Sequence, residues 1–233
     1  MWIASMTYVH ADNTLIVAID PGHTEKYYGA TSASGEKEYT YNIKMSNILL
    51  NTLNNTKNIK AFIINPAGKS IKLKARTAMA EQRNADIFIS IHHDSVQKKY
   101  LTTSIVNGKK NHFSKKFKGY SLFVSKKNNY YTKSFLLAEN IGRGIKEKRF
   151  TPTLHHAEKI KRENRILLDT TLGIYRFDDL IVLKSADIPS VLIECGIIVN
   201  PQEESSIKNT NYHQRLSNGI LAGLKTYMQS AKQ

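Results

Sequence analysis

The sequence has one cysteine, no long apolar run and few acidic residues. A single cysteine, Cys195, excludes a disulfide within the chain. No apolar run approaches the ~18–20 residues needed to cross a bilayer, so we expect no transmembrane segment. No Gly/Ser-rich or Pro-rich linker interrupts the 233 residues, which favours a single domain.

The shortage of acidic residues leaves the chain strongly basic. There are 34 Lys and Arg residues against 19 Asp and Glu, a net charge of +15. Such a charge favours an anionic partner, and nucleic acid, an acidic membrane face or an anionic wall polymer would all qualify. The lysines are spread through 98–118, 126–133 and 146–162 without a recognition-helix pattern, so we expect no nucleic-acid partner. A merely well-solvated basic surface explains the charge equally well.

The first thirteen residues differ in character from the rest. They lack the basic start and full apolar core of a secretory signal, although Val9-His10-Ala11 has small residues where a signal would end. We interpret residues 1–13 as a tail or a signal remnant, and 14–233 as one folded domain.

Short apolar runs alternate with helical patterns along the domain. Helices are expected at 37–55, 70–84, 131–148 and 211–228, and a polar surface loop at 94–118. Strands are expected at 14–19, 60–65, 86–91, 119–125, 180–184 and 190–194. This alternation predicts an α/β fold, with one twisted, mostly parallel sheet of about six strands and helices on both faces.

Three of the predicted strands run directly into ionisable side chains. "IVAIDPGH" ends in His23, "DIFISI" leads to His92, and "SVLI" leads to Glu194. If these strands are parallel neighbours, the three side chains converge at one sheet edge. Two imidazoles and a carboxylate suit zinc, but a surface histidine or a structural glutamate is about as good an explanation. Glu36 and Glu38, at the start of the 37–55 helix, offer a further carboxylate.

Four stretches together resemble the zinc-dependent N-acetylmuramoyl-L-alanine amidases of the amidase-3 type. They are "IVAIDPGH", "GEKEYTYN", "KARTAMAEQRNADIFISIHHD" and "PSVLIECGIIVNPQEE", and the resemblance covers residues 14–228. It implies that 14–233 is a catalytic domain in which His23, Glu38 and His92 hold Zn²⁺. Glu194 is then the general base and acid rather than a ligand.

The resemblance also implies a substrate and a location. The substrate is peptidoglycan, cut at the amide between N-acetylmuramic acid and L-alanine, and the enzyme works outside the cytoplasm, periplasmic or secreted. Anionic wall polymers would then account for the positive charge. The sequence identifies no activator protein.

The chain departs from the family pattern at a few positions. Thr24-Glu25 replaces the usual Gly-Gly, and His93-Asp94 replaces the frequent Ala-Asn. We expect His93 to be a non-catalytic neighbour and Cys195 to be a buried small residue. A thiol hydrolase using Cys195 with His92 or His93, and a wall-binding protein without turnover, remain as alternatives.

The stretch 151–169 contains His155, His156 and Glu158. These residues would suit a second metal site or a segment covering the substrate, but a polar loop leading into a helix is the favoured interpretation. Some family members carry an inhibitory helix here. The stretch is too short for a full blocking helix, so we predict an open site.

Overall fold

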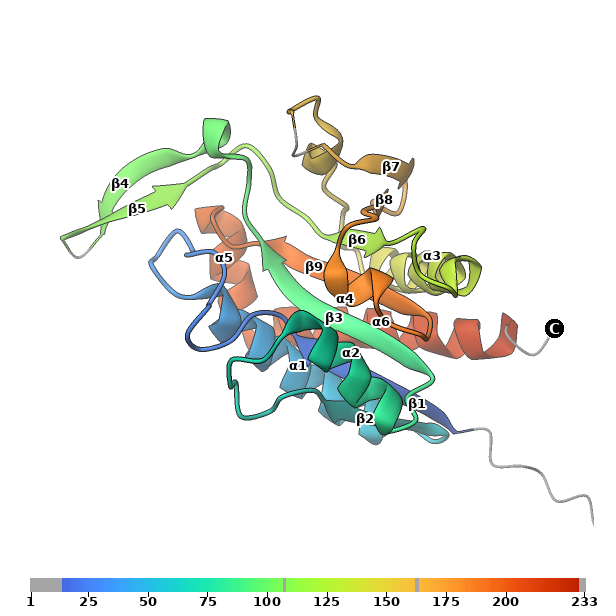
Figure 1. Ribbon diagram of the computed structural model, residues 1–233. Helices are drawn as coiled ribbons and strands as arrows, with labels where there is room; N and C mark the ends of the chain where they lie inside the picture. The colour runs from blue at the N-terminus through green and yellow to red at the C-terminus, as the bar shows by residue number, and fades with distance from the viewer. Residues whose placement is uncertain (1–13, 107, 162–163, 231–233) are drawn as a thin grey trace, which may run out of the picture.

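A twisted sheet forms the centre of the molecule, which is described by a computed structural model for residues 14–106, 108–161 and 164–230 (Figure 1). The predicted tail, 1–13, lies outside the described residues. The sheet strands are β1 (Leu15–Pro21), β2 (Ile59–Ile63), β3 (Ile87–Asp94), β6 (Ser121–Val124), β7 (Ile166–Asp169), β8 (Ile174–Arg176) and β9 (Ser190–Ile197).

The strand order is β2-β1-β3-β9-β6-β8-β7. The neighbours from β2 to β9 pair in parallel, β6 pairs antiparallel with β9 and parallel with β8, and β7 pairs antiparallel with β8. The expectation of a mostly parallel sheet is therefore confirmed, with seven strands rather than about six. The four parallel strands end at one edge, where the predicted site residues lie.

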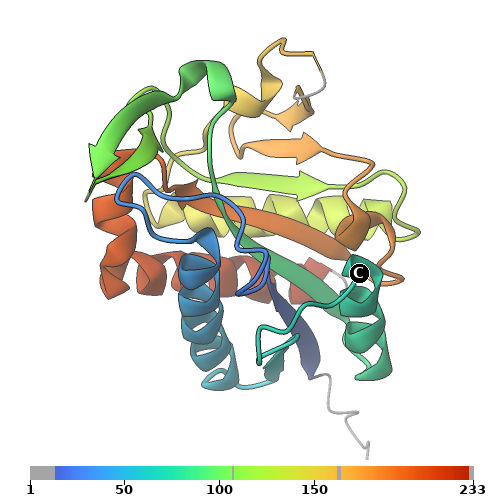
Figure 2. The ribbon, with the colours of Figure 1, turned by 60° about the vertical axis from the view of Figure 1, so that its left-hand side comes forward.

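Helices cover both faces of the sheet, as predicted (Figure 2). On one face lie α1 (Glu38–Asn54), α3 (Tyr131–Glu147) and α6 (Thr210–Ser230); on the other lie α2 (Leu73–Gln82) and α4 (Ile181–Lys184). Side chains alternate along β1: Val17 and Ile19 join the first core, and Ala18 joins the second. Burial on both faces explains why the central strands read as continuous apolar runs.

One predicted strand is wrong. Residues 180–184 contain the short helix α4, which buries Val182 and Leu183 in the second core. A four-residue apolar run fits a buried helical turn as well as a buried strand, and periodicity cannot separate them. The edge strand β7, its neighbour β8 and the short helix α5 (Pro201–Lys208) were not predicted.

The predicted loop at 94–118 contains a β-hairpin. Its strands, β4 (Thr102–Val106) and β5 (Lys109–Phe113), form a separate antiparallel sheet that projects from the body of the molecule (Figure 1). The stretch 151–169 also differs from expectation, because it holds the 3₁₀ turn η2 (His155–Ala157) and then β7 rather than a helix.

Candidate metal centre

The turn after β1 places His23 at the sheet edge. The Gly22 N–H donates to the Ile91 carbonyl at 2.8 Å, which ties the turn to β3. A Cβ on Gly22 would lie 2.2 Å from Cε1 of His92, so only glycine lets the turn come this close to that ring. His23 itself has a φ of 69°, the left-handed region that few side chains adopt.

Arg76 of α2 also holds this turn in place through hydrogen bonds. Its guanidinium donates to Asp20 Oδ1 at 2.6 Å, to the Pro21 carbonyl at 2.8 Å and to the His23 carbonyl at 2.5 Å. Ser90 donates to the other oxygen of Asp20 at 3.0 Å. Since Arg76 and Asp20 are almost fully buried, this ion pair replaces hydration by several directed hydrogen bonds.

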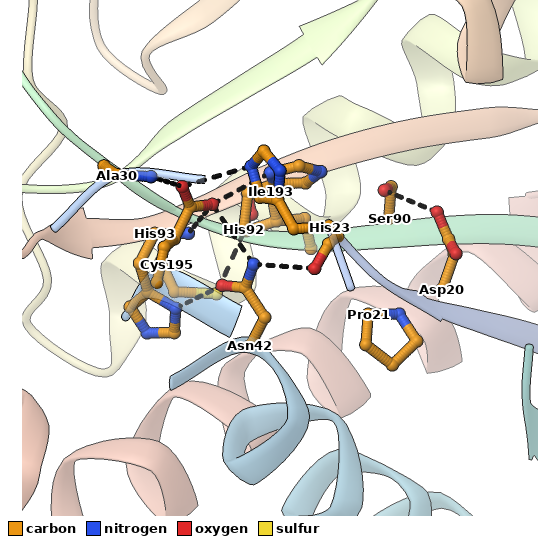
Figure 3. A network of polar contacts seen from close by, with 12 residues as sticks. Asp20, Pro21, His23, Ala30, Asn42, Ser90, His92, His93, Ile193 and Cys195 are labelled. Atoms are coloured by element: carbon orange, nitrogen blue, oxygen red, sulfur yellow. Dashed lines mark hydrogen bonds and ion pairs between the residues drawn. The ribbon is translucent and has the colours of Figure 1, made fainter. Parts of the chain in front are cut away.

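The structure brings His23, Glu38 and His92 together. Figure 3 shows the two histidines close to each other. Glu38 Oε2 lies 3.1 Å from His23 Nε2, and Oε1 lies 3.1 Å from His92 Nδ1. One candidate ligand atom from each residue lies within 4.8 Å of the other two. Two imidazole nitrogens and one carboxylate oxygen match the donor set of a zinc site that keeps a position for water.

Further hydrogen bonds orient Glu38, which begins α1. Its Oε2 accepts from the Ala30 N–H at 2.9 Å, and its Oε1 accepts from Asn42 Nδ2 at 3.1 Å (Figure 3). Asn42 lies one helical turn further along α1, and its Oδ1 lies 2.8 Å from His93 Nδ1. His93 therefore supports Glu38 through Asn42 and does not point into the metal cluster.

Electrostatics favour the charged form of Glu38. Burial acts to raise its pKa, but hydrogen bonds from His23 and His92, together with their charges, outweigh burial and hold the pKa below its ordinary value. A carboxyl group that stays ionised is ready to bind a cation without first losing a proton.

Glu194 lies beside this cluster on the adjacent strand. It is paired with His92 in the register of β3 and β9. Among the described residues, its Oε2 has no hydrogen-bond partner. Burial, with added repulsion from the carboxylates of Asp94 and Glu38, raises the pKa of Glu194 well above its ordinary value.

A cleft of about 380 Å³ opens next to His23 and His92. Its lining is mainly apolar and includes Leu180 and Val182 from the α4 region. The segment predicted as a strand thus forms one wall of the cleft. His23 keeps 32% of its side chain exposed, so an incoming group can reach this edge.

Cys195 is fully buried in the first core, as expected of a small residue at this position. Burial raises the pKa of its thiol well above the ordinary value. A protonated, inaccessible thiol is a poor nucleophile, which argues against the thiol hydrolase alternative.

Sequence reasoning missed two parts of this region. No pattern marks Arg76 as buried beneath the His23 turn, because an arginine in a polar helix ordinarily faces water. The second is the part of Asp94: the sequence offered His155 and His156 for a second metal site with Glu158 but favoured a polar loop, whereas the ligand atoms of the two histidines lie within 4.8 Å of that of Asp94.

Comparisons with known proteins agree with this geometry. A family model described as N-acetylmuramoyl-L-alanine amidase matches residues 17–226. A Buchnera aphidicola (subsp. Acyrthosiphon pisum) protein bearing that amidase name is 29% identical, and the match covers 91% of this chain and 94% of the relative. The amidase AmiC of Escherichia coli O6:H1 is 26% identical over 93% of this chain, which spans only 53% of AmiC. The crystal structure of the amidase from Clostridium difficile 630 superposes with a TM-score of 0.71 at 26% identity, covering 94% of this chain and 98% of that one.

Proposed function

Because the chain belongs to the N-acetylmuramoyl-L-alanine amidase family, whose enzymes hydrolyse peptidoglycan, we propose that it is a zinc-dependent hydrolase. The bond cut is the amide between N-acetylmuramic acid and L-alanine. In this proposal His23, Glu38 and His92 hold the zinc ion, and Glu194 moves the proton. The observation that carries it is that Glu194 stands beside a ready-made cluster of two imidazoles and an ionised carboxylate.

The donor set and its surroundings fit zinc better than magnesium or calcium, which prefer oxygen ligands. When bound, zinc supplies Lewis acidity, which strongly lowers the pKa of a water ligand and stabilises charge on an amide oxygen. The chain's own contribution is rigidity, since Ala30 and Asn42 orient the Glu38 carboxylate and Arg76 holds the turn that carries His23.

Glu194 is suited to carry a proton between two partners. Its raised pKa makes it a stronger base than an ordinary carboxylate, and a cation bound next to it brings that pKa down toward the working pH. In this role Glu194 accepts the proton of the attacking water and delivers it to the leaving nitrogen of L-alanine. An amine is a poor leaving group, so the delivery step is essential.

Digestion of purified peptidoglycan tests the proposal directly. We expect soluble stem peptides with a free L-alanine amino terminus, identified by mass spectrometry, and none after removal of metal by a chelator. Activity should return when zinc is added back. A thiol-alkylating reagent should have no effect, because Cys195 is buried. Digestion that survives the chelator but not the alkylating reagent would favour the thiol mechanism instead.

The basic charge supports a second element of the proposal, attraction to anionic wall polymers. The segment 98–118, which includes the projecting hairpin, has no acidic residue. Its exposed lysines are Lys98, Lys99, Lys110, Lys115, Lys116 and Lys118. Since peptidoglycan lies outside the cytoplasm, we propose a periplasmic or secreted location. Within the described residues, no helix has the length and apolarity needed to span a bilayer.

Binding to purified walls at low and high salt tests the electrostatic attraction. We expect binding to fall as salt rises, because exposed charges are screened. Replacing Lys98, Lys99, Lys115 and Lys116 by alanine should weaken binding more than the same change at four exposed lysines elsewhere. The matched set is Lys57, Lys60, Lys133 and Lys146. Equal losses from both sets would mean that net charge, rather than the hairpin segment, attracts the wall.

A further inference from the structure

A second group of metal-ligating side chains lies apart from the first and shares no residue with it. Asp94 ends β3, while His155 and His156 stand in the turn η2. A single oxygen of Asp94, Oδ2, lies 2.7 Å from His156 Nε2 and 3.5 Å from His155 Nε2. The two imidazole centroids are 3.9 Å apart. Three side chains from two distant segments thus direct their donor atoms at one point.

His155 has an unpartnered nitrogen at this point. The side chain is 1% exposed. Its Nδ1 lies 2.9 Å from Thr153 Oγ1, but among the described residues Nε2 has no hydrogen-bond partner. Leaving a buried polar atom unpaired is destabilising. In the tautomer in which Nδ1–H donates to Thr153, Nε2 presents its lone pair toward the Asp94 carboxylate, which is the orientation of a metal ligand.

The hydrogen bond on the other side of the His155 ring agrees with this arrangement. A ligating histidine commonly donates its other ring N–H to a neighbouring oxygen, which orients the ring and fixes its tautomer. Thr153 occupies that position for His155.

Packing holds both rings in place. Phe117 stacks on His155 with centroids 5.2 Å apart, and Phe123 meets the edge of His156 at 4.9 Å. The backbone carbonyl of His155 accepts from Gln97 Nε2 at 3.1 Å, which ties η2 to the segment after β3. A hollow of about 330 Å³ gives access to Asp94 and both histidines. The two rings are therefore held in position, and an ion can reach the three side chains through the hollow.

We propose that Asp94, His155 and His156 form a second metal site, which takes a divalent transition metal of the zinc class. Two imidazoles with one carboxylate select such ions over calcium and magnesium. The ion would fasten η2 to the carboxyl end of β3. Glu158, which the sequence grouped with these histidines, takes no part, since its carboxylate accepts from Tyr100 and pairs with Lys99.

Metal stoichiometry tests the second site without relying on activity. Chelator-treated protein is dialysed against excess free Zn²⁺ at neutral pH and its bound zinc is counted by elemental analysis. We expect two ions per wild-type chain and one in His156→Ala. The matched control is His112→Ala, an exposed histidine on β5, which should keep two. Circular dichroism checks that each variant is folded. Asp94→Asn, which preserves side-chain shape, serves as the second variant and should also bind one ion.

A Glu38→Gln background separates this inference from the proposed function. We expect one ion in Glu38→Gln and none in Glu38→Gln combined with His156→Ala. If wild-type protein binds a single ion that only Glu38→Gln removes, the second site is refuted and the first stands. If only His156→Ala removes it, the first assignment fails and the second stands. Two ions retained in both His156→Ala and Asp94→Asn would place the additional ion elsewhere and overturn the proposal.

Discussion

The two histidine–carboxylate clusters have similar donor sets but are held in different ways. In the first, His23, Glu38 and His92 come from two parallel strand ends and the start of a long helix. In the second, Asp94 comes from a strand end, but both histidines come from one turn of a segment with little regular structure. The first cluster is supported by the sheet and its core, and the second by a few contacts of η2.

The two clusters also differ in their expected roles, which are catalysis for the first and attachment of a chain segment for the second. Glu194 stands next to His92 in the first cluster, so that cluster has a group able to move protons. The second cluster instead connects a surface segment to the end of β3. Changes that damage one cluster should therefore leave the other intact.

The largest expected effect is loss of turnover in Glu194→Gln. A general acid–base residue contributes about 10²–10⁴-fold, so peptide release from peptidoglycan should fall by that factor. Glutamine has the same shape but cannot accept the proton. Zinc content should be unchanged at both clusters, measured by elemental analysis, and Glu147→Gln on the exposed end of α3 is the control. Zinc lost together with activity would instead mark Glu194 as a ligand.

The next largest effect is on stability, in Arg76→Ala. Removing Arg76 leaves Asp20 buried without its partner, which costs about 3–5 kcal/mol of unfolding free energy. Urea denaturation measures it. Arg143→Ala, which breaks an exposed pair with Glu139 on α3, should cost less than about 1 kcal/mol. Similar losses in the two variants would mean that Arg76 does not clamp the His23 turn.

The first cluster was predictable because regular structure determines it. His23, His92 and Glu194 lie at the ends of strands that can be recognised in the sequence by their apolar runs. Neighbouring parallel strands end at the same edge of a sheet. Choosing Glu38 over Glu36 needed the family resemblance, since both acids stand at a helix start. In the structure Glu38 is buried against Ala30 and Asn42, whereas Glu36 is exposed.

The second cluster was not predictable in the same way. Its histidines lie in a turn, and nothing in the sequence indicates that the chain folds back so that Asp94 and His155, separated by 60 intervening residues, meet at one point. The error at 180–184 has a related cause, because a short apolar run does not reveal whether it packs as a strand or as the helical wall of the cleft.

Asn42→Ala should affect the first cluster alone. Asn42 donates to Glu38 and contacts His93, so its loss leaves the Glu38 carboxylate, the proposed ligand, less firmly oriented. Loss of such an orienting partner typically weakens metal binding by about 10–100-fold. Competition with a chromophoric chelator measures the affinity of each ion. Asn54→Ala, an exposed asparagine on the same helix, should change neither, and weakening of both ions by Asn42→Ala would show that the clusters are coupled.

An effect of pH on stability is expected from Glu203, which supports the strand end behind the second cluster. Its carboxylate accepts from the Gly119 and Ile197 N–H groups, and Ile197 is paired with Asp94. Burial raises the pKa of Glu203 from 4.5 to about 7, although those hydrogen bonds oppose the shift. Between these values the folded protein binds a proton that the unfolded chain has released.

Stability linked to Glu203 is therefore complete below about pH 4.5 and is lost as pH rises through 7, by an amount on the order of 3 kcal/mol. Urea denaturation of chelator-treated protein between pH 5 and 8 measures this loss, and Glu203→Gln should reduce it. The exposed Glu147→Gln should leave the pH dependence unchanged. If Glu203→Gln keeps the full pH dependence, a group other than Glu203 destabilises the fold at high pH. The strand end that carries Asp94 is then not weakened by the titration of Glu203.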